Sequence, residues 1–200
     1  KVCYFCMHPN IGISLRITHA KDYDEKRDSL SHDWPKLMEE LGINIVFIPN
    51  SLKNVRSYLT ELNLSGFIIS GGDNIGDDVK REKTEIEMIK FATKNKIPLF
   101  GVCRGMQIIN KFFNGTISIN EKSNHVGKHH TINIVNQNFF RFFKNKHTQV
   151  NSFHNNLIYT ENLGRDLIPF ATISEDGTVE GFFHKFFGHR LDVLFPRHYP

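Results

Sequence analysis

The segment 98–107 places a cysteine between an apolar run and the start of a helical pattern. The run is typical of a buried strand, and a helix is expected to follow from Met106. A glycine lies two residues to either side of Cys103, at Gly101 and Gly105. This layout is typical of a nucleophile elbow, a sharp strand-to-helix turn that exposes a reactive side chain. Glycines on either side suit such a turn because they have no Cβ atom to crowd it. The positive end of the helix would favour the thiolate; a buried structural cysteine is the alternative.

A second unusual pair of residues, Gly71 and Gly72, follows another expected strand at 66–69. In open α/β sheets, ligands bind at the carboxyl ends of the strands. A cysteine that attacks an acyl carbon forms an oxyanion, which preorganised backbone N–H groups usually stabilise. The amides of Gly72 and Arg104 are the candidate donors for that role. The alternative for the glycines alone is an ordinary strand-to-helix loop.

Alternating strand and helix patterns predict an α/β fold, with an open, mostly parallel sheet and helices on both faces. The strands expected in the first half are 11–17, 44–48, 66–69 and the run before Cys103. The helices expected between them are 24–41, 52–62, 79–95 and one that ends near Gly115. Short β-segments are expected afterwards at 116–119, 131–135, 167–173 and 178–183, the last two joined by a hairpin turn at 175–177. No repeat or composition break divides the chain, so one domain spanning residues 1–200 is predicted.

Composition excludes several classes of function. The 200 residues carry a net charge of +4 with scattered basic residues, so nucleic-acid binding is not expected. No apolar run approaches the roughly 20 residues that would cross a bilayer, and no membrane partner is expected. Three cysteines do not make a disulfide framework, which favours a reducing cytoplasm. Cys3 and Cys6 form an isolated Cys-x-x-Cys, so no metal site is predicted.

Five segments occur in order along the chain: Ile11-Gly12-Ile13-Ser14 with Arg16, Ser70-Gly71-Gly72-Asp73, Gly101-Val102-Cys103-Arg104-Gly105-Met106-Gln107, Val150-Asn151-Ser152-Phe153-His154 and Asp176-Gly177-Thr178-Val179-Glu180. Together they resemble the class I glutamine amidotransferase-like family, and more narrowly its γ-glutamyl hydrolase branch, which includes γ-glutamyl-γ-aminobutyrate hydrolase. The resemblance implies a flavodoxin-like three-layer fold with extra β-hairpins in the C-terminal half. It also implies hydrolysis of a γ-glutamyl amide without a metal or organic cofactor.

The resemblance also implies roles for individual residues. Cys103 is the implied nucleophile, and the amides of Gly72 and Arg104 are the implied oxyanion donors. Three residues are implied to hold the α-amino and α-carboxylate groups of the substrate: Gln107, Ser152 and His154. His125 falls in a loop that flanks the pocket in this branch. On the residues alone, Gln107 also fits an exposed helix position, and His125 also fits a solvated loop.

The chain departs from the family at its C-terminal end. The family has an apolar strand followed by Trp-His-Pro-Glu, which supplies a general base and the acid that orients it. Here the apolar run 191–195 is followed by Pro196-Arg197-His198, without that motif. His198 is the expected base, whereas His184 and His189 precede the run and are weaker candidates. A diverged C-terminus, as a shifted reading frame would produce, and a site that binds without turnover are the alternatives.

The short chain resembles the small γ-glutamyl hydrolases of surface-polysaccharide pathways, which implies a conjugate such as γ-glutamyl-CDP-amidate from capsule phosphoramidate synthesis as substrate. Other options are a γ-glutamyl-γ-aminobutyrate hydrolase, a glutaminase subunit that feeds a separate synthetase, and a catalytically impaired γ-glutamyl-binding domain. The oligomeric state stays open, with a homodimer as one option.

Overall fold

The computed structural model describes residues 8–119, 128–143, 145–152, 156–174, 176–186 and 191–193. Its helices are α1 (Asp33–Glu40), α2 (Val55–Glu61), α3 (Val79–Asn95) and α4 (Arg104–Phe112), with 3-10 turns η1 (Gln137–Phe142) and η2 (Thr160–Asn162). Its first strands are β1 (Asn10–Ser14), β2 (Arg16–His19), β3 (Lys26–Ser29), β4 (Asn44–Ile48), β5 (Gly66–Ile69) and β6 (Leu99–Gly101). The remaining strands are β7 (Ser118–Ile119), β8 (Lys128–Ile134), β9 (His147–Ser152), β10 (Asn156–Leu157), β11 (Leu167–Ile173), β12 (Val179–His184) and β13 (Leu191–Val193).

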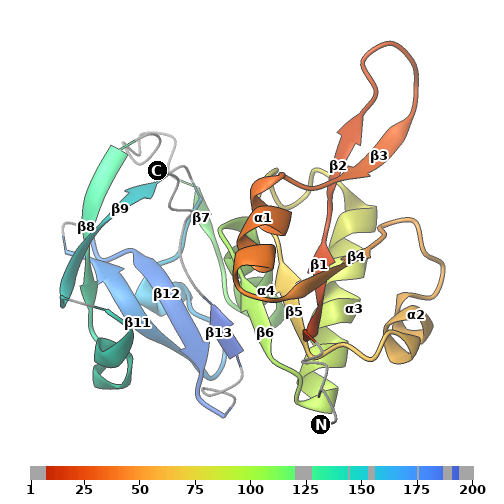
Figure 1. Cartoon of the computed structure of the whole chain (residues 1–200). Coiled ribbons are helices and arrows are strands. Elements are labelled where there is room, and N and C mark those ends of the chain that lie inside the picture. The colour runs from red at the N-terminus through yellow and green to blue at the C-terminus, as the bar shows by residue number, and fades with distance from the viewer. Residues whose placement is uncertain are drawn as a thin grey trace, which may run out of the picture.

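Within the described residues, nine strands form one sheet in the order β4-β1-β5-β6-β13-β12-β11-β8-β9 (Figure 1). The strands from β4 to β13 run parallel to one another, and the strands from β12 to β9 pair antiparallel. The parallel half brings the carboxyl ends of β5, β6 and β13 to one edge of the sheet. The predicted parallel sheet with β-hairpins in the C-terminal half is confirmed.

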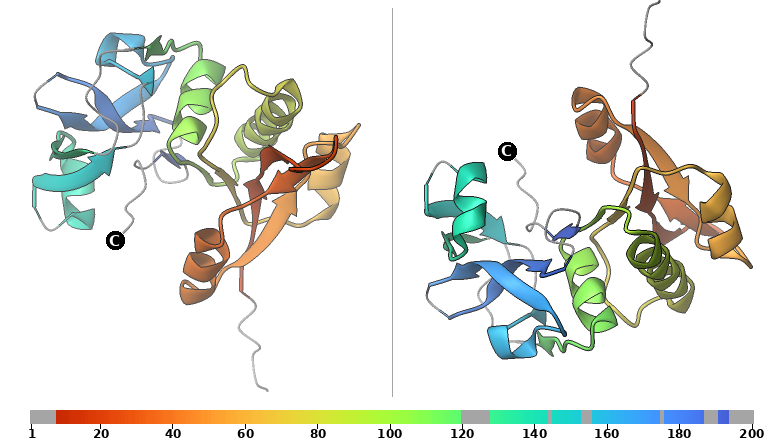
Figure 2. Two further views of the ribbon diagram at one scale, coloured as in Figure 1. Left: turned by 90° about the horizontal axis from the view of Figure 1, so that it is seen from above. Right: turned by 90° about the horizontal axis from the view of Figure 1, so that it is seen from below.

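Helices cover both faces of the parallel half (Figure 2). Successive side chains of a strand point to opposite faces, and β5 shows the consequence. Ile68 packs in one buried cluster with Trp34 of α1, whereas Phe67 and Ile69 belong to the cluster that contains Met88 of α3. The predicted three-layer arrangement is therefore present.

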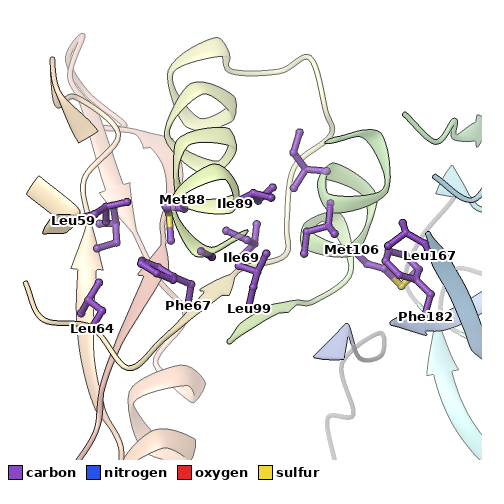
Figure 3. Packing of buried hydrophobic residues seen from close by; sticks show 14 of the residues in the cluster. Leu59, Leu64, Phe67, Ile69, Met88, Ile89, Leu99, Met106, Leu167 and Phe182 are labelled. Carbon is purple, nitrogen blue, oxygen red and sulfur yellow. The ribbon is translucent and has the colours of Figure 1, made fainter. Parts of the chain in front are cut away.

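The larger cluster joins the two halves of the molecule. Figure 3 shows Met106 of α4 facing Leu167 and Phe182, which come from β11 and β12. A second cluster lies within the antiparallel half, where the rings of Phe139 and Phe170 stack with centroids 4.1 Å apart. The helix that carries the elbow is thus packed against both parts of the sheet.

The N-terminal quarter differs from the prediction. The strand predicted at 11–17 is divided at Leu15 into β1 and β2. The helix predicted at 24–41 begins only at Asp33, because residues before it form β3, which pairs antiparallel with β2. Asp24 lies in the turn of this hairpin, which extends beyond the sheet in Figure 1. Its mostly exposed, charged strands lack the apolar alternation that marks a half-buried strand.

The other predicted elements agree more closely. β4, β5, α3 and β11 have the predicted bounds, whereas α2 begins three residues later than predicted, after Asn54. The side chain of Asn54 accepts a hydrogen bond from the Ser57 amide and caps the helix. β9, β10 and the two 3-10 turns are absent from the prediction. None of the helices in the described part of the chain has the length and apolar character needed to cross a bilayer.

Candidate active site

Cys103 lies in a sharp turn between β6 and α4. Its backbone has φ 53° and ψ −111°, a conformation that L-residues rarely adopt. The turn is held on both sides, because the Val102 amide donates to the Ile69 carbonyl at 3.0 Å and the Gly105 amide donates to the Val102 carbonyl at 2.8 Å. The half-buried cysteine begins the helix as its N-terminal cap residue. The turn predicted from the glycine spacing is present.

The two glycines that flank Cys103 allow α4 to pack directly on the sheet backbone. A Cβ atom on Gly105 would lie 2.0 Å from the carbonyl oxygen of Ile69, well inside contact distance. A Cβ atom on Gly101 would lie 2.8 Å from the carbonyl of Gly105 and 2.6 Å from Ile109. A larger residue at either position would force the helix away from the strand. The spacing in the sequence is therefore a steric requirement of this turn.

Residues 70–73, called the glycine loop below, follow β5 beside the cysteine. A Cβ atom on Gly71 would lie 3.3 Å from the Cβ and 4.0 Å from the Sγ of Cys103. Gly72 has φ +84°, and Arg16 packs on the side where its Cβ atom would be. Neither the Gly72 amide nor the Arg104 amide donates a hydrogen bond to a described residue. The loop thus brings backbone close to the sulfur without a side chain between them.

A small pocket opens beside Cys103. It is lined by Cys103, Met106, Gln107, Asn156, Ile158, Val179 and Glu180. Gln107 is 4% exposed, so it does not lie on the outer face of the helix, and its Oε1 accepts a 3.4 Å hydrogen bond from Asn156. Glu180 is buried, with its Oε2 3.9 Å from Nε2 of His130. The pocket therefore places a thiol, a carboxyl group, two carboxamides and apolar side chains around a space of about 10 Å³, which is room for about one water molecule.

Three buried charged side chains lie behind the elbow and the glycine loop. The Nε of Arg81 donates to Oε1 of Glu85 at 2.9 Å, and Arg104 donates to the other carboxylate oxygen. These three residues are at most 1% exposed. Burial lowers the pKa of Arg81, while the Glu85 carboxylate acts to raise it. The sequence analysis missed Arg81 and Glu85, although an Arg–Glu pair four residues apart is a recognisable helix contact.

The predicted site residues are only partly within the described chain. Gly72, Cys103, Arg104 and Gln107 lie together at the carboxyl ends of β5 and β6. Ser152 is the last residue of β9, and its backbone pairs with Lys128. Three predicted residues lie outside the described residues: His125, His154 and His198. The same is true of His189 and of Cys3 and Cys6.

His184 lies far from the pocket. It is 4% exposed at the end of β12, where it packs on Phe113 and where its Nδ1 accepts from the Phe186 amide at 3.3 Å. Burial lowers its pKa. Glu180, which lines the pocket, precedes it by four strand residues, or about 13 Å. His184 is therefore excluded as the base that serves Cys103.

Residues 9–187 match the family described as Peptidase C26. The chain belongs to this family. Gamma-glutamyl-CDP-amidate hydrolase of Campylobacter jejuni is 37% identical over 183 residues, which cover 88% of this chain and 84% of that protein. The membership expected from the five sequence segments is thus confirmed, and a cysteine nucleophile is general for this family.

Two solved structures agree with the fold at low sequence identity. A glutamine amidotransferase from Thermotoga maritima has a TM-score of 0.66 and 18% identity, covering 94% of this chain and 74% of that one. The glutaminase domain of CTPS from Trypanosoma brucei has a TM-score of 0.62 and 15% identity, covering 88% and 81%. Both likenesses concern the arrangement of the sheet and helices alone.

The contact between α4 and β5 gives a direct test of the elbow. We expect Gly105→Ala to lower the free energy of unfolding by about 3 kcal/mol, the upper end of the usual cost of overpacking, because the new methyl would overlap the Ile69 carbonyl. This loss should appear despite the higher helix propensity of alanine. Urea denaturation provides the measurement.

Gly177→Ala is the matched control, since Gly177 has φ +73° but open space around its Cβ position. We expect Gly177→Ala to lower the free energy of unfolding by about 1–2 kcal/mol, the cost of placing an L-residue in the left-handed region. A loss for Gly105→Ala no larger than that of Gly177→Ala would contradict the steric account.

Proposed function

We propose that this protein hydrolyses a γ-glutamyl amide and releases glutamate, with a nucleotide amidate such as CDP-amidate as the leaving group. The observation that carries the proposal is the strained Cys103 turn, with the glycine loop against it and a small pocket of apolar and polar side chains beside it. The leaving group is inferred from the relative in Campylobacter jejuni, whose name specifies that substrate. The proposed reaction takes place in the cytoplasm, as the cysteine usage of the sequence favours.

The reaction proceeds in two steps. The thiolate of Cys103 attacks the γ-carbonyl carbon, and the carbonyl electrons move onto oxygen, where the amides of Gly72 and Arg104 donate hydrogen bonds. The C–N bond then breaks, and the leaving nitrogen takes a proton from the general acid. A water molecule gives its proton to the same group and attacks the thioester, so that glutamate leaves and the thiolate is restored.

The side chains that line the pocket have the chemistry to contact a glutamyl group. Met106, Ile158 and Val179 offer apolar contact to its methylene carbons. Gln107, together with Ser152 and His154, is assigned to the α-amino and α-carboxylate groups. His125 is assigned to the flank of the pocket.

His198 is assigned as the acid and base. β13 runs parallel to β6, with Val193 opposite Gly101, so the chain leaves β13 at the edge where Cys103 lies. His198 follows Val193 by five residues, which can span at most about 18 Å. This direction favours His198 over His184, which lies at the other edge.

The substrate is tested by incubating the protein with γ-glutamyl-CDP-amidate, γ-glutamyl-γ-aminobutyrate and glutamine and measuring released glutamate. We expect the nucleotide conjugate to give the highest kcat/KM and Cys103→Ala to release no glutamate from any of the three. A preference for γ-glutamyl-γ-aminobutyrate would contradict the assigned leaving group. Absence of turnover with every compound would contradict hydrolysis and favour a binding domain.

The base is tested with His198→Gln. We expect kcat to fall by about 100- to 10,000-fold, the usual contribution of a general acid–base group, while the unfolding midpoint stays unchanged. His19→Gln, an exposed change on β2, is the control and should retain full activity. A His198→Gln protein with undiminished kcat would remove this histidine from the mechanism.

A further inference from the structure

The guanidinium of Arg81 contacts three successive carbonyl groups of the glycine loop. Its Nη2 donates to the Ser70 and Gly71 carbonyls, each at 3.0 Å, and its Nη1 donates to the Gly72 carbonyl at 2.9 Å. Nη1 also donates to the Asp73 carboxylate at 2.9 Å. One buried side chain therefore bonds every residue of the loop.

The planarity of the peptide bond determines where the loop amides point. In a trans peptide the carbonyl of one residue and the N–H of the next are opposed in a single plane, and the described chain has no cis peptide. The carbonyls of Ser70 and Gly71 face Arg81, so the amides of Gly71 and Gly72 face away from it. Gly71 adjoins the turn of the nucleophile, because a Cβ atom on it would lie 3.3 Å from the Cβ of Cys103. Contacts with Arg81 thus fix the direction of the amides that would meet an oxyanion.

An arginine is suited to this task. Its planar fork presents five N–H groups in fixed directions, whereas a lysine presents three from one rotating atom. The remaining Nε of Arg81 donates to Glu85, which fixes the plane of the fork. Glu85 also binds Arg104, the residue after the nucleophile, and accepts from Ser14 at 3.1 Å. The carboxylate therefore joins the glycine loop to the first turn of α4.

We propose that Arg81, oriented by Glu85, is a positioning residue that holds the glycine loop so that its amides converge with the Arg104 amide on the reacting carbonyl. This role rests on the proposed hydrolysis. Arg81 would act by keeping the loop amides in place to stabilise the oxyanion of the transition state. Neither side chain touches substrate. Their removal should therefore lower kcat with little change in KM, and should spare reactions of Cys103 that form no oxyanion.

The test compares two reactions of the same sulfur in Arg81→Lys. The first is release of nitroaniline from γ-glutamyl-p-nitroanilide, which requires an oxyanion. The second is alkylation by iodoacetamide, which displaces iodide at a saturated carbon and requires none. We expect kcat for the anilide to fall about 100-fold, the typical effect of losing one oxyanion donor. KM and the alkylation rate should stay within about threefold of wild type, since the proposal leaves both unaffected beyond ordinary mutational scatter. Lys83→Met, an exposed change on the same helix, should behave as wild type in both reactions.

Glu85→Asp is the second variant, used if Arg81→Lys fails to fold. It retains the charge that pairs with both arginines but shortens the side chain by one methylene group, so the plane of the Arg81 guanidinium is no longer fixed in the same way. We expect the same divergence between the two reactions at about tenfold, less than the loss of a whole oxyanion donor. Equal losses in hydrolysis and alkylation, or an unchanged hydrolysis rate in the folded variant, would overturn the positioning role alone. Absence of hydrolysis by the wild type, with normal alkylation, would overturn the proposed function itself.

Discussion

The ion cluster of Arg81, Glu85 and Arg104 is the interaction on which the arrangement of this site depends. Moving charged groups out of water costs several kcal/mol each, and only close pairing with further hydrogen bonds offsets that cost. Here the pairing is close, because Glu85 lies between the two guanidinium groups and Arg81 also bonds the glycine loop. Loss of one partner would leave a buried charge uncompensated, which typically costs 3–5 kcal/mol. The cluster therefore fixes two loops from separate strands relative to each other.

The elbow packs against the end of β5, and the ion cluster bonds the glycine loop that follows β5. Because Gly105 has no side chain, α4 packs so closely on β5 that a Cβ atom there would lie 2.0 Å from the Ile69 carbonyl oxygen. This close packing determines the position of the turn at Cys103. Arg81 then determines how the neighbouring glycine loop is turned. A strained cysteine turn costs conformational energy, and the hydrogen bonds and packing around it supply that energy. The geometry of the candidate site thus depends on backbone packing at Gly105 and on the hydrogen bonds that Arg81 donates to the glycine loop.

The sequence predicted the parallel half of the fold well, because buried parallel strands are continuous apolar runs, as in β5. The prediction from sequence was wrong for strands that are held by backbone pairing and have no regular apolar face. Strands β2 and β3 are mostly exposed and charged, and β9, with the sequence HTQVNS, has no apolar alternation. At the site, the positions of Cys103 and the glycines followed from steric rules that local sequence expresses. The contacts of Arg81 depend on a loop nine residues away in sequence and on a third element, so no local pattern reveals them.

The central claim is that Cys103 forms a covalent bond to a glutamyl group during turnover. Intact mass spectrometry of acid-quenched mixtures with γ-glutamyl-CDP-amidate measures this directly. The account predicts a mass increase of one glutamyl group, located on the peptide that contains Cys103, and no increase in Cys103→Ala. Release of glutamate by Cys103→Ala at the wild-type rate, or a glutamyl adduct that persists in that variant, would contradict the account.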